Sequence, residues 1–183
     1  FLSNKPKEGK EKRDSKKDLH KSIGDILGAR EVSTPFGEHL LVERAYPVSH
    51  IHGNVQLDLI NDISGEIIKL IAKSPDYENF DFKRAVFIDT ETTGLAGGSG
   101  TLAFLIGVGF FQGKDFKVLQ YFISDYDKEA AALYSFGKLL EEFDSIVTFN
   151  GKSYDIPLLE ARYMLSRMEI PFNKSFHLDL LPS

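Results

Sequence analysis

Hydrophobic residues form short uninterrupted runs in the second half of the chain, a pattern typical of buried β-strands. The first three runs, at residues 84–91, 102–111 and 116–124, predict three consecutive strands, with Gln-Gly-Lys-Asp as the turn between the last two. Two shorter runs, at 145–150 and 175–180, predict two more strands.

Between these runs, apolar residues recur every three or four positions, which predicts helices. We expect one helix from Asp127, which can cap it, to about Phe143. A second helix is expected from about Ile156 to Arg167. The predicted order is therefore β-β-β-α-β-α-β, which indicates a mixed α/β sheet.

The first half of the chain has a weaker pattern. A β-prone run that ends at Pro47 predicts a small strand or hairpin, and apolar spacing between Gln56 and Lys73 predicts one helix or two short ones. We expect three segments: a flexible charged tail (1–31), an N-terminal extension with short strands and a helix (32–80), and an α/β domain (81–183).

Composition limits the classes of protein that fit. The 183 residues are 42% hydrophobic, enough for a sizeable core, so a wholly disordered chain is excluded. The absence of cysteine excludes disulfides, thiolate zinc sites and a thiol nucleophile, so any metal must bind oxygen or imidazole. No apolar run reaches the roughly 18 to 20 residues of a membrane helix, and we expect a cytoplasmic protein.

Charge is distributed unevenly along the chain. Residues 1–20 contain seven Lys or Arg against four Asp or Glu, a net charge of +3, while the rest of the chain carries −8. An acidic body disfavours nonspecific binding to nucleic-acid phosphates, unless some of its carboxylates hold divalent cations.

Asp89 and Glu91 are the first candidate cation ligands. They stand two residues apart at the end of a buried run, so a strand would direct both side chains to one face. Two anions beside an apolar run are costly unless they are hydrated, paired or bound to a cation. A solvated strand end before the loop Thr-Thr-Gly-Leu-Ala-Gly-Gly-Ser-Gly explains these two residues equally well.

Asp155 is the third candidate, because it lies between a predicted strand and a predicted helix. Taken alone, Asp155 fits the role of helix N-cap, with Pro157 in the first turn. Taken with Asp89 and Glu91, it completes an oxygen-only cluster suited to Mg²⁺ or Mn²⁺.

Two segments resemble a known group of enzymes. Phe-Ile-Asp-Thr-Glu-Thr-Thr-Gly-Leu is similar to the first motif of the DEDD exonucleases, the proofreading-type superfamily with a ribonuclease H-like fold. Asn-Gly-Lys-Ser-Tyr-Asp matches their second motif of Asn, three residues, an aromatic and Asp. The resemblance covers about residues 84–180, and within the superfamily it is greatest to the YprB-like group of bacterial predicted exonucleases.

This resemblance implies a ribonuclease H-like mixed five-stranded sheet with flanking helices. It also implies a metal-dependent 3′-to-5′ exonuclease that acts on 3′ ends of single-stranded DNA or RNA. Asp89, Glu91 and Asp155 would hold two Mg²⁺ or Mn²⁺ ions, and Asn150 and Tyr154 would support the second motif. Further substrate contacts are expected from two loops, at Thr90, Thr92, Thr93, Gly94, Leu95 and Lys152. A plain polar turn is the alternative for the first loop, and a solvated lysine explains Lys152 equally well.

A third motif of the family, a His or Tyr followed by a fourth metal-binding Asp, is expected beyond residue 183, so the predicted domain is incomplete at its C-terminal end. His177 and Asp179 fall within a predicted strand and lack the spacing of that motif, and we expect them to support the core. A catalytically inactive ribonuclease H-like module that binds nucleic acid or protein is the alternative reading.

Overall fold

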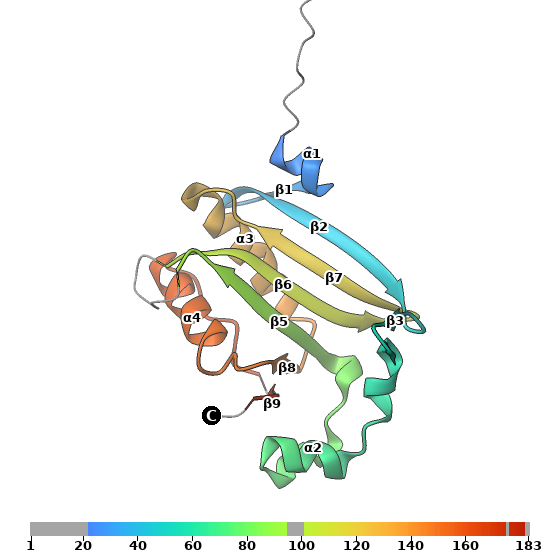
Figure 1. Ribbon diagram of the computed structural model, residues 1–183. Helices are drawn as coiled ribbons and strands as arrows, with labels where there is room; N and C mark the ends of the chain where they lie inside the picture. Colours follow the sequence, from blue (N-terminus) through green and yellow to red (C-terminus); the bar gives the residue numbers. More distant parts are fainter. Residues whose placement is uncertain (1–21, 95–100, 175, 182–183) are drawn as a thin grey trace, which may run out of the picture.

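Figure 1 shows the computed structural model, which describes residues 22–94, 101–174 and 176–181. In this part of the chain, seven strands form one sheet in the order β1-β2-β7-β6-β5-β8-β9, and β3 and β4 pair as a separate hairpin. None of the described helices is long and apolar enough to cross a membrane.

The large sheet consists of β1 (Arg30–Thr34), β2 (Gly37–Pro47), β5 (Ala85–Thr92), β6 (Ala103–Gln112), β7 (Asp115–Phe122), β8 (Ser145–Thr148) and β9 (Phe176–Asp179). The small hairpin consists of β3 (Ile51–His52) and β4 (Val55–Gln56). The α-helices are α1 (Ile23–Leu27), α2 (Gly65–Ala72), α3 (Tyr126–Leu140) and α4 (Asp155–Leu165), and three 3₁₀ helices are η1 (Leu57–Asp62), η2 (Pro75–Asn79) and η3 (Phe82–Arg84).

The predicted mixed α/β architecture is confirmed, with small differences at the ends of elements. The carboxylate that caps α3 belongs to Asp125 rather than Asp127, because it accepts a hydrogen bond from the Tyr126 amide at 2.7 Å. β8 ends at Thr148 rather than at residue 150, because Asn150 has a left-handed backbone with φ of 62°.

The N-terminal extension adds two strands to the sheet. β2 pairs antiparallel with β7 from Leu40 to Pro47, and β1 pairs with β2 at the edge. The tail was expected to reach residue 31, but its described part is folded. Ser22 and Asp25 form a capping box that starts α1, and Arg30 begins β1.

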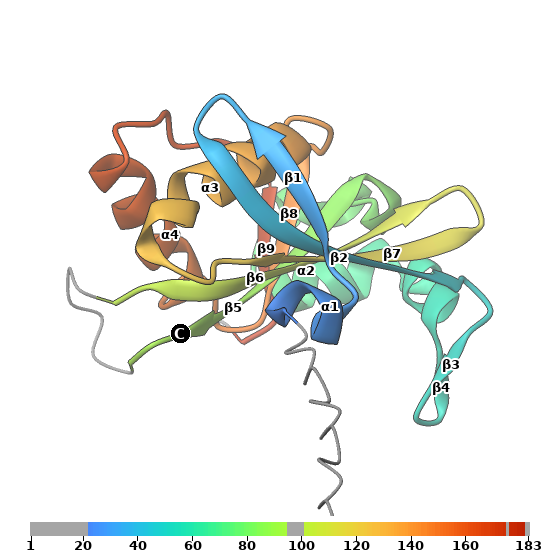
Figure 2. The ribbon, with the colours of Figure 1, turned by 90° about the horizontal axis from the view of Figure 1, so that it is seen from above.

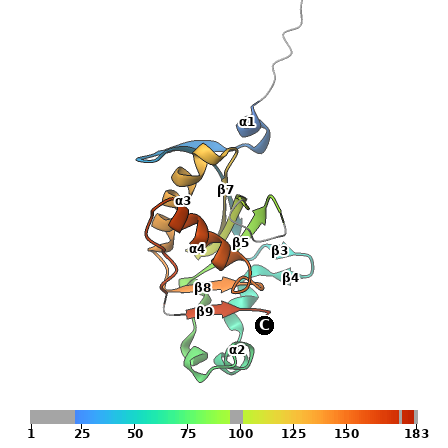
Figure 3. The same cartoon turned by 90° about the vertical axis from the view of Figure 1, so that its left-hand side faces the viewer.

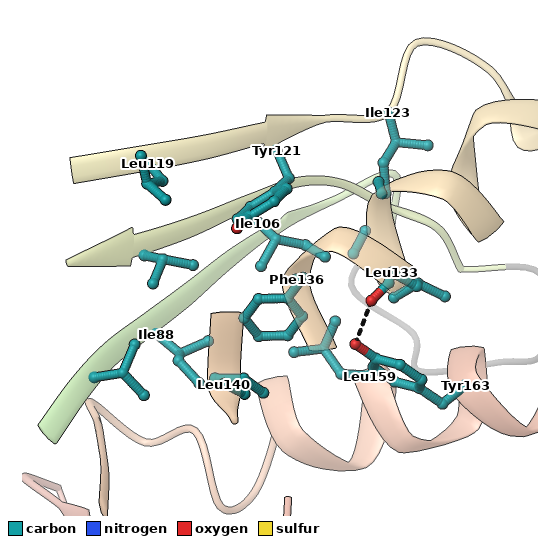
Figure 4. Packing of buried hydrophobic residues seen from close by; sticks show 14 of the residues in the cluster. Ile88, Ile106, Leu119, Tyr121, Ile123, Leu133, Phe136, Leu140, Leu159 and Tyr163 are labelled. Carbon is teal, nitrogen blue, oxygen red and sulfur yellow. Dashed lines mark hydrogen bonds between the residues drawn. The ribbon is translucent and has the colours of Figure 1, made fainter. Parts of the chain in front are cut away.

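α3 and α4 lie together on one face of the sheet (Figure 2). Ile88 and Ile106 of the sheet pack there in one core cluster with Phe136 of α3 and Leu159 of α4, and the hydroxyl of Tyr163 donates to the Leu133 carbonyl at 2.7 Å (Figure 4). Alternation of side chains along β5 therefore directs its even-numbered residues toward these helices.

The opposite face carries a second apolar cluster. Phe80 and Phe82, with Ile68 of α2, pack in this cluster with Ala85 of β5 and Val147 of β8. The segment between β4 and β5 therefore covers the amino-terminal end of β5 and leaves its carboxyl-terminal end to the loops that follow β5 and β8.

β5 stands where the sheet changes from antiparallel to parallel pairing. It pairs antiparallel with β6 and parallel with β8, and β8 pairs parallel with β9. Figure 3 shows β8 and β9 side by side and running in the same direction. The carboxyl ends of β5, β8 and β9 consequently meet at one edge, the usual place for a ligand site in an α/β sheet.

A buried ion pair joins the two large helices. Nε of Arg162 in α4 lies 2.5 Å from one carboxylate oxygen of Glu129 in α3, and a terminal guanidinium nitrogen lies 2.6 Å from the other. Both residues are less than 10% exposed. A two-pronged charged bond of this kind fixes the rotation of α4 relative to α3 as well as their separation.

Breaking this pair should strongly destabilise the chain. Arg162→Met removes the guanidinium and leaves the buried Glu129 carboxylate without it, so the free energy of unfolding should fall by about 3 kcal/mol. Urea denaturation measures the change. Lys138→Ala, in the exposed pair of Lys138 with Glu141, should cost less than about 1 kcal/mol. Equal losses in the two variants would contradict a special role for the buried pair.

Candidate active site

Asp89 and Glu91 take their direction from β5. Both follow Phe87 on the face away from α4, and both are exposed. The pairing of β5 with β6 shifts register between Glu91 and Thr92, where β6 contains the extra residue Phe104. Such a bulge bends the strand and redirects its last side chains.

A tight turn after β8 leads into α4 and to Asp155. Asn150 takes the left-handed conformation there, and Gly151 packs against Thr148 so closely that a Cβ atom would lie 2.5 to 2.8 Å from three atoms of its side chain. Only glycine fits at this position without a shift of the turn or of β8. Asp155 is thereby placed at the start of α4, next to the end of β5.

The Asp155 carboxylate bonds to β5. Asp155 is 8% exposed, and its Oδ1 accepts a hydrogen bond from the Thr90 hydroxyl at 2.6 Å. The N-cap of α4 is Tyr154, whose side chain makes no capping bond, and Asp155 is the first residue inside the helix. The geometry thus favours contact with β5 over N-capping as the role of Asp155.

Electrostatics connects the three acids. Burial raises the pKa of Asp89, and the negative charges of Asp155 and then Glu91 raise this pKa further. Asp89 therefore lies close enough to both Asp155 and Glu91 for their charges to disfavour its ionised form. Within residues 22–94, 101–174 and 176–181, none of them forms an ion pair with Lys, Arg or His.

These residues fit a divalent cation by the chemistry of their donors. Carboxylate oxygens are preferred ligands of Mg²⁺ and Mn²⁺, and an uncompensated cluster of negative charge attracts a cation. In the part of the chain that is described, no three Asp, Glu, His or Cys side chains are grouped tightly enough to enclose a metal ion. The arrangement is an open set of carboxylates on two sides of one strand end.

Comparison with known proteins places this site in a family. Residues 86–182, which contain all three acids, match the RNase_H superfamily.

The chain belongs to the RNase_H superfamily. It is also 36% identical over 151 residues to the uncharacterized protein YprB of Bacillus subtilis strain 168, with 78% of this chain and 35% of that protein covered. The chain thus spans about a third of this relative's length. The RNase H-like fold is confirmed, and such domains generally act on nucleic acids as hydrolases that typically use divalent metals.

The end of β5 and the loop after it contain several of the predicted substrate contacts, and Thr90 and Thr92, which were expected in a loop, belong to the strand. The Thr92 hydroxyl donates to the Gly94 carbonyl at 3.0 Å, and the Thr93 hydroxyl accepts from the Leu102 amide at 3.1 Å. These bonds shape the base of the loop, and Gly94 is exposed. Leu95 lies outside the described residues. Thr90 differs from this group because its hydroxyl is bonded to Asp155.

The loop after β8 presents aromatic side chains beside the acids. Phe149 and Tyr154 are each 66% exposed, and Lys152 between them is exposed too. Phe149 was missed as a functional candidate because it continues the apolar run of β8, and its position directly before Asn150 is the signal that could have identified it. Asn150 is half-buried, and its backbone amide bonds to Asp179.

Asp89 and Phe149 share a hollow on the sheet face opposite α4. Its volume is about 390 Å³, and its walls include Phe116, Val118 and Leu180. A second hollow of about 400 Å³ lies beside α3 and is lined by Phe36, Tyr134 and Arg167, but by none of the three acids. Of these two hollows, the first has a site acid, Asp89, in its wall.

His177 and Asp179 both lie in β9 and make hydrogen bonds next to the loop after β8. Burial, together with the positive charge of Lys152, lowers the pKa of His177 to about 4, so the ring is neutral at physiological pH. Its Nε2 lies 2.9 Å from the Thr148 hydroxyl. Asp179 is 4% exposed and bonds to backbone amides of the loop after β8.

Removing the charge of Asp89 should stabilise the metal-free protein near pH 7. Its pKa is raised in the folded state, so the folded chain holds this proton more tightly than the unfolded chain. The stability that Asp89 contributes is therefore complete at low pH and is lost as the pH rises through the raised pKa. Asp89→Asn should increase the free energy of unfolding by less than about 1 kcal/mol, because the carboxylate is solvent-exposed.

Urea denaturation in EDTA at several pH values measures this effect. The gain in the free energy of unfolding should disappear below about pH 4, where Asp89 is protonated in both the folded and the unfolded chain. Asp62→Asn, an exposed acid at the end of η1, is the control and should show no such gain. A less stable Asp89→Asn variant at pH 7 would contradict the raised pKa of Asp89.

Proposed function

We propose that this chain is the nuclease domain of a metal-dependent 3′-to-5′ exonuclease of the DEDD type. The observation behind this proposal is that Asp89, Glu91 and Asp155 gather at the carboxyl end of β5, where Thr90 bonds Asp155 and where the charges of Asp155 and Glu91 help to raise the pKa of Asp89. Among the described residues, none of these acids pairs with a positively charged side chain, so a bound cation best explains why they are grouped. Asp89, Glu91 and Asp155 are the ligands we assign to Mg²⁺ or Mn²⁺.

Two bound divalent ions would supply an activated water and stabilise the charge on the leaving 3′ oxygen. The residues of the chain would hold these ions and the substrate in position. Asp89 and Glu91 are held by the pairing of β5 with β6, and Thr90 fixes one oxygen of Asp155. The second oxygen of Asp155 has no partner among the described residues, which suits a metal ligand. Ligands mounted on a rigid sheet keep their geometry without induced movement.

The substrate we propose is the 3′ end of single-stranded DNA or RNA. Phe149 and Tyr154 offer exposed rings for stacking on unpaired bases, and Lys152 offers a charge for a phosphate. Stacking of this kind requires bases that are free of a partner strand. The hollow beside Asp89 and Phe149 provides room on the same side of the sheet.

A second candidate is an inactive module that binds nucleic acid without cutting it. The open arrangement of the acids favours this reading, since no three metal-ligating side chains are grouped within the described residues. The two candidates differ in their response to metal. Mn²⁺ should raise the melting temperature of a nuclease and raise it less in Asp89→Ala, whereas it should not distinguish the two proteins if the module is inert.

Loss of a site carboxylate should abolish nuclease activity. The full-length protein is incubated with Mn²⁺ and single strands labelled at the 5′ end, which a 3′ exonuclease shortens to a ladder. Asp89→Asn and Asp155→Asn should each slow this shortening by at least about 100-fold, because each removes a proposed metal ligand. EDTA should stop the reaction.

The matched control is Asp62→Asn, which removes an acid far along the chain from the site and should keep full activity. A strand with a blocked 3′ end should resist degradation. Equal degradation by the wild type, Asp89→Asn and Asp155→Asn would refute the proposal, and attack on the blocked strand would refute the 3′-to-5′ direction.

A further inference from the structure

A single buried carboxylate ties the loop after β8 to β9. Oδ1 of Asp179 accepts the amide of Asn150 at 2.6 Å and the amide of Leu181 at 3.3 Å, and Oδ2 accepts the amide of Lys152 at 2.9 Å. Asp179 is the last residue of β9, and only 4% of it is exposed. A buried charge is retained only where its partners compensate it, so these amide bonds are strong local constraints.

The loop that Asp179 holds is conformationally demanding. Asn150 has a positive φ of 62°, and Gly151 stands where a Cβ atom would collide with Thr148. A left-handed residue that is not glycine costs free energy and persists where its surroundings impose it. The two amides of this loop that donate to Asp179 lie directly before and after Gly151, so the carboxylate spans the tightest point of the turn.

This turn decides where Asp155 lies. The Gly151 carbonyl accepts the amide of Ile156 at 2.9 Å, so the turn and the first residues of α4 form one hydrogen-bonded unit. On the other side, β8 and β9 are joined by parallel pairing from Ser145 to Thr148. A shift of the turn would therefore move Asp155 relative to Asp89, which is fixed independently in β5.

We propose that Asp179 is the positioning residue of the site: through the backbone of the turn at Asn150–Lys152 it sets the place of Asp155, and with it the affinity for the divalent cation. Asp179 itself touches neither cation nor substrate. This inference rests on the proposed function, because it assumes that Asp155 is a metal ligand. It predicts that a change in β9, outside both motifs, alters metal binding.

The test compares Mn²⁺ affinity in the full-length wild type, Asp179→Asn and Asp179→Ser by calorimetry, at a temperature where each protein is folded. Either variant should raise the Kd for Mn²⁺ about tenfold, the usual effect of removing a supporting hydrogen bond around a metal site. Exonuclease activity should fall at low Mn²⁺ and return to within about twofold of wild type at saturating Mn²⁺. A residue that serves stability alone would lower the melting temperature and leave the Kd unchanged.

Asp144→Asn is the matched control. Asp144 precedes the opposite end of β8, is exposed and pairs with Arg84, so its loss should leave the Kd for Mn²⁺ unchanged. A wild-type Kd in both Asp179 variants would overturn this inference alone. A wild-type protein that neither binds Mn²⁺ nor cuts would overturn the proposed function, and the inference with it.

Hydrogen exchange in the wild type decides the matter if both variants fail to fold. The amides of Asn150 and Lys152 should exchange as slowly as the amide of Leu180, which bonds to the Thr148 carbonyl beside them at 2.9 Å. Exchange of the two amides at the rate of a free loop would show that the Asp179 anchor is absent and overturn the inference.

Discussion

The charges of Asp155 and Glu91 help burial to raise the pKa of Asp89 at the carboxyl end of β5, and the fold holds these like charges together. Asp89 and Glu91 are fixed by pairing with β6, and Asp155 is brought to them by the parallel alignment of β8 with β5. The free energy that offsets the cost of gathering these charges comes chiefly from the burial of apolar clusters on both faces of the sheet. Concentrated charge that costs stability is typical of a site shaped for a ligand.

Two other buried acids, Glu129 and Asp179, have fuller compensation within the chain than Asp155 has. Glu129 is neutralised by Arg162, and Asp179 is satisfied by backbone amides of the turn after β8. Both arrangements compensate the acid from within the chain. Asp155, with a comparable degree of burial, receives one hydroxyl from Thr90. The contrast distinguishes acids that build the fold from an acid that keeps an oxygen available.

Much of this could be predicted from the sequence because its main signals are local. The apolar runs of β5, β6 and β7 and the spacing of Leu133 and Phe136 depend on neighbours a few residues away. The pairing of β2 with β7 could not be predicted, because it joins segments some 75 residues apart. For Asp155 taken alone, a helix cap could not be distinguished from a contact with β5, because both roles suit an acid between a strand and a helix.

Asp155 belongs to α4 in sequence, yet strands determine where it lies. Thr90 of β5 holds its carboxylate, Asp179 of β9 holds the turn that precedes it, and that turn folds over the end of β8 at Gly151. The three parallel strands of the sheet thus converge on one side chain of a helix. Movement of α4 as a rigid body is resisted at its first residue, and the ion pair of Arg162 with Glu129 resists it two turns further along. A helix restrained at both points holds Asp155 at a fixed distance from β5, as the proposed set of metal ligands from a strand and a helix requires.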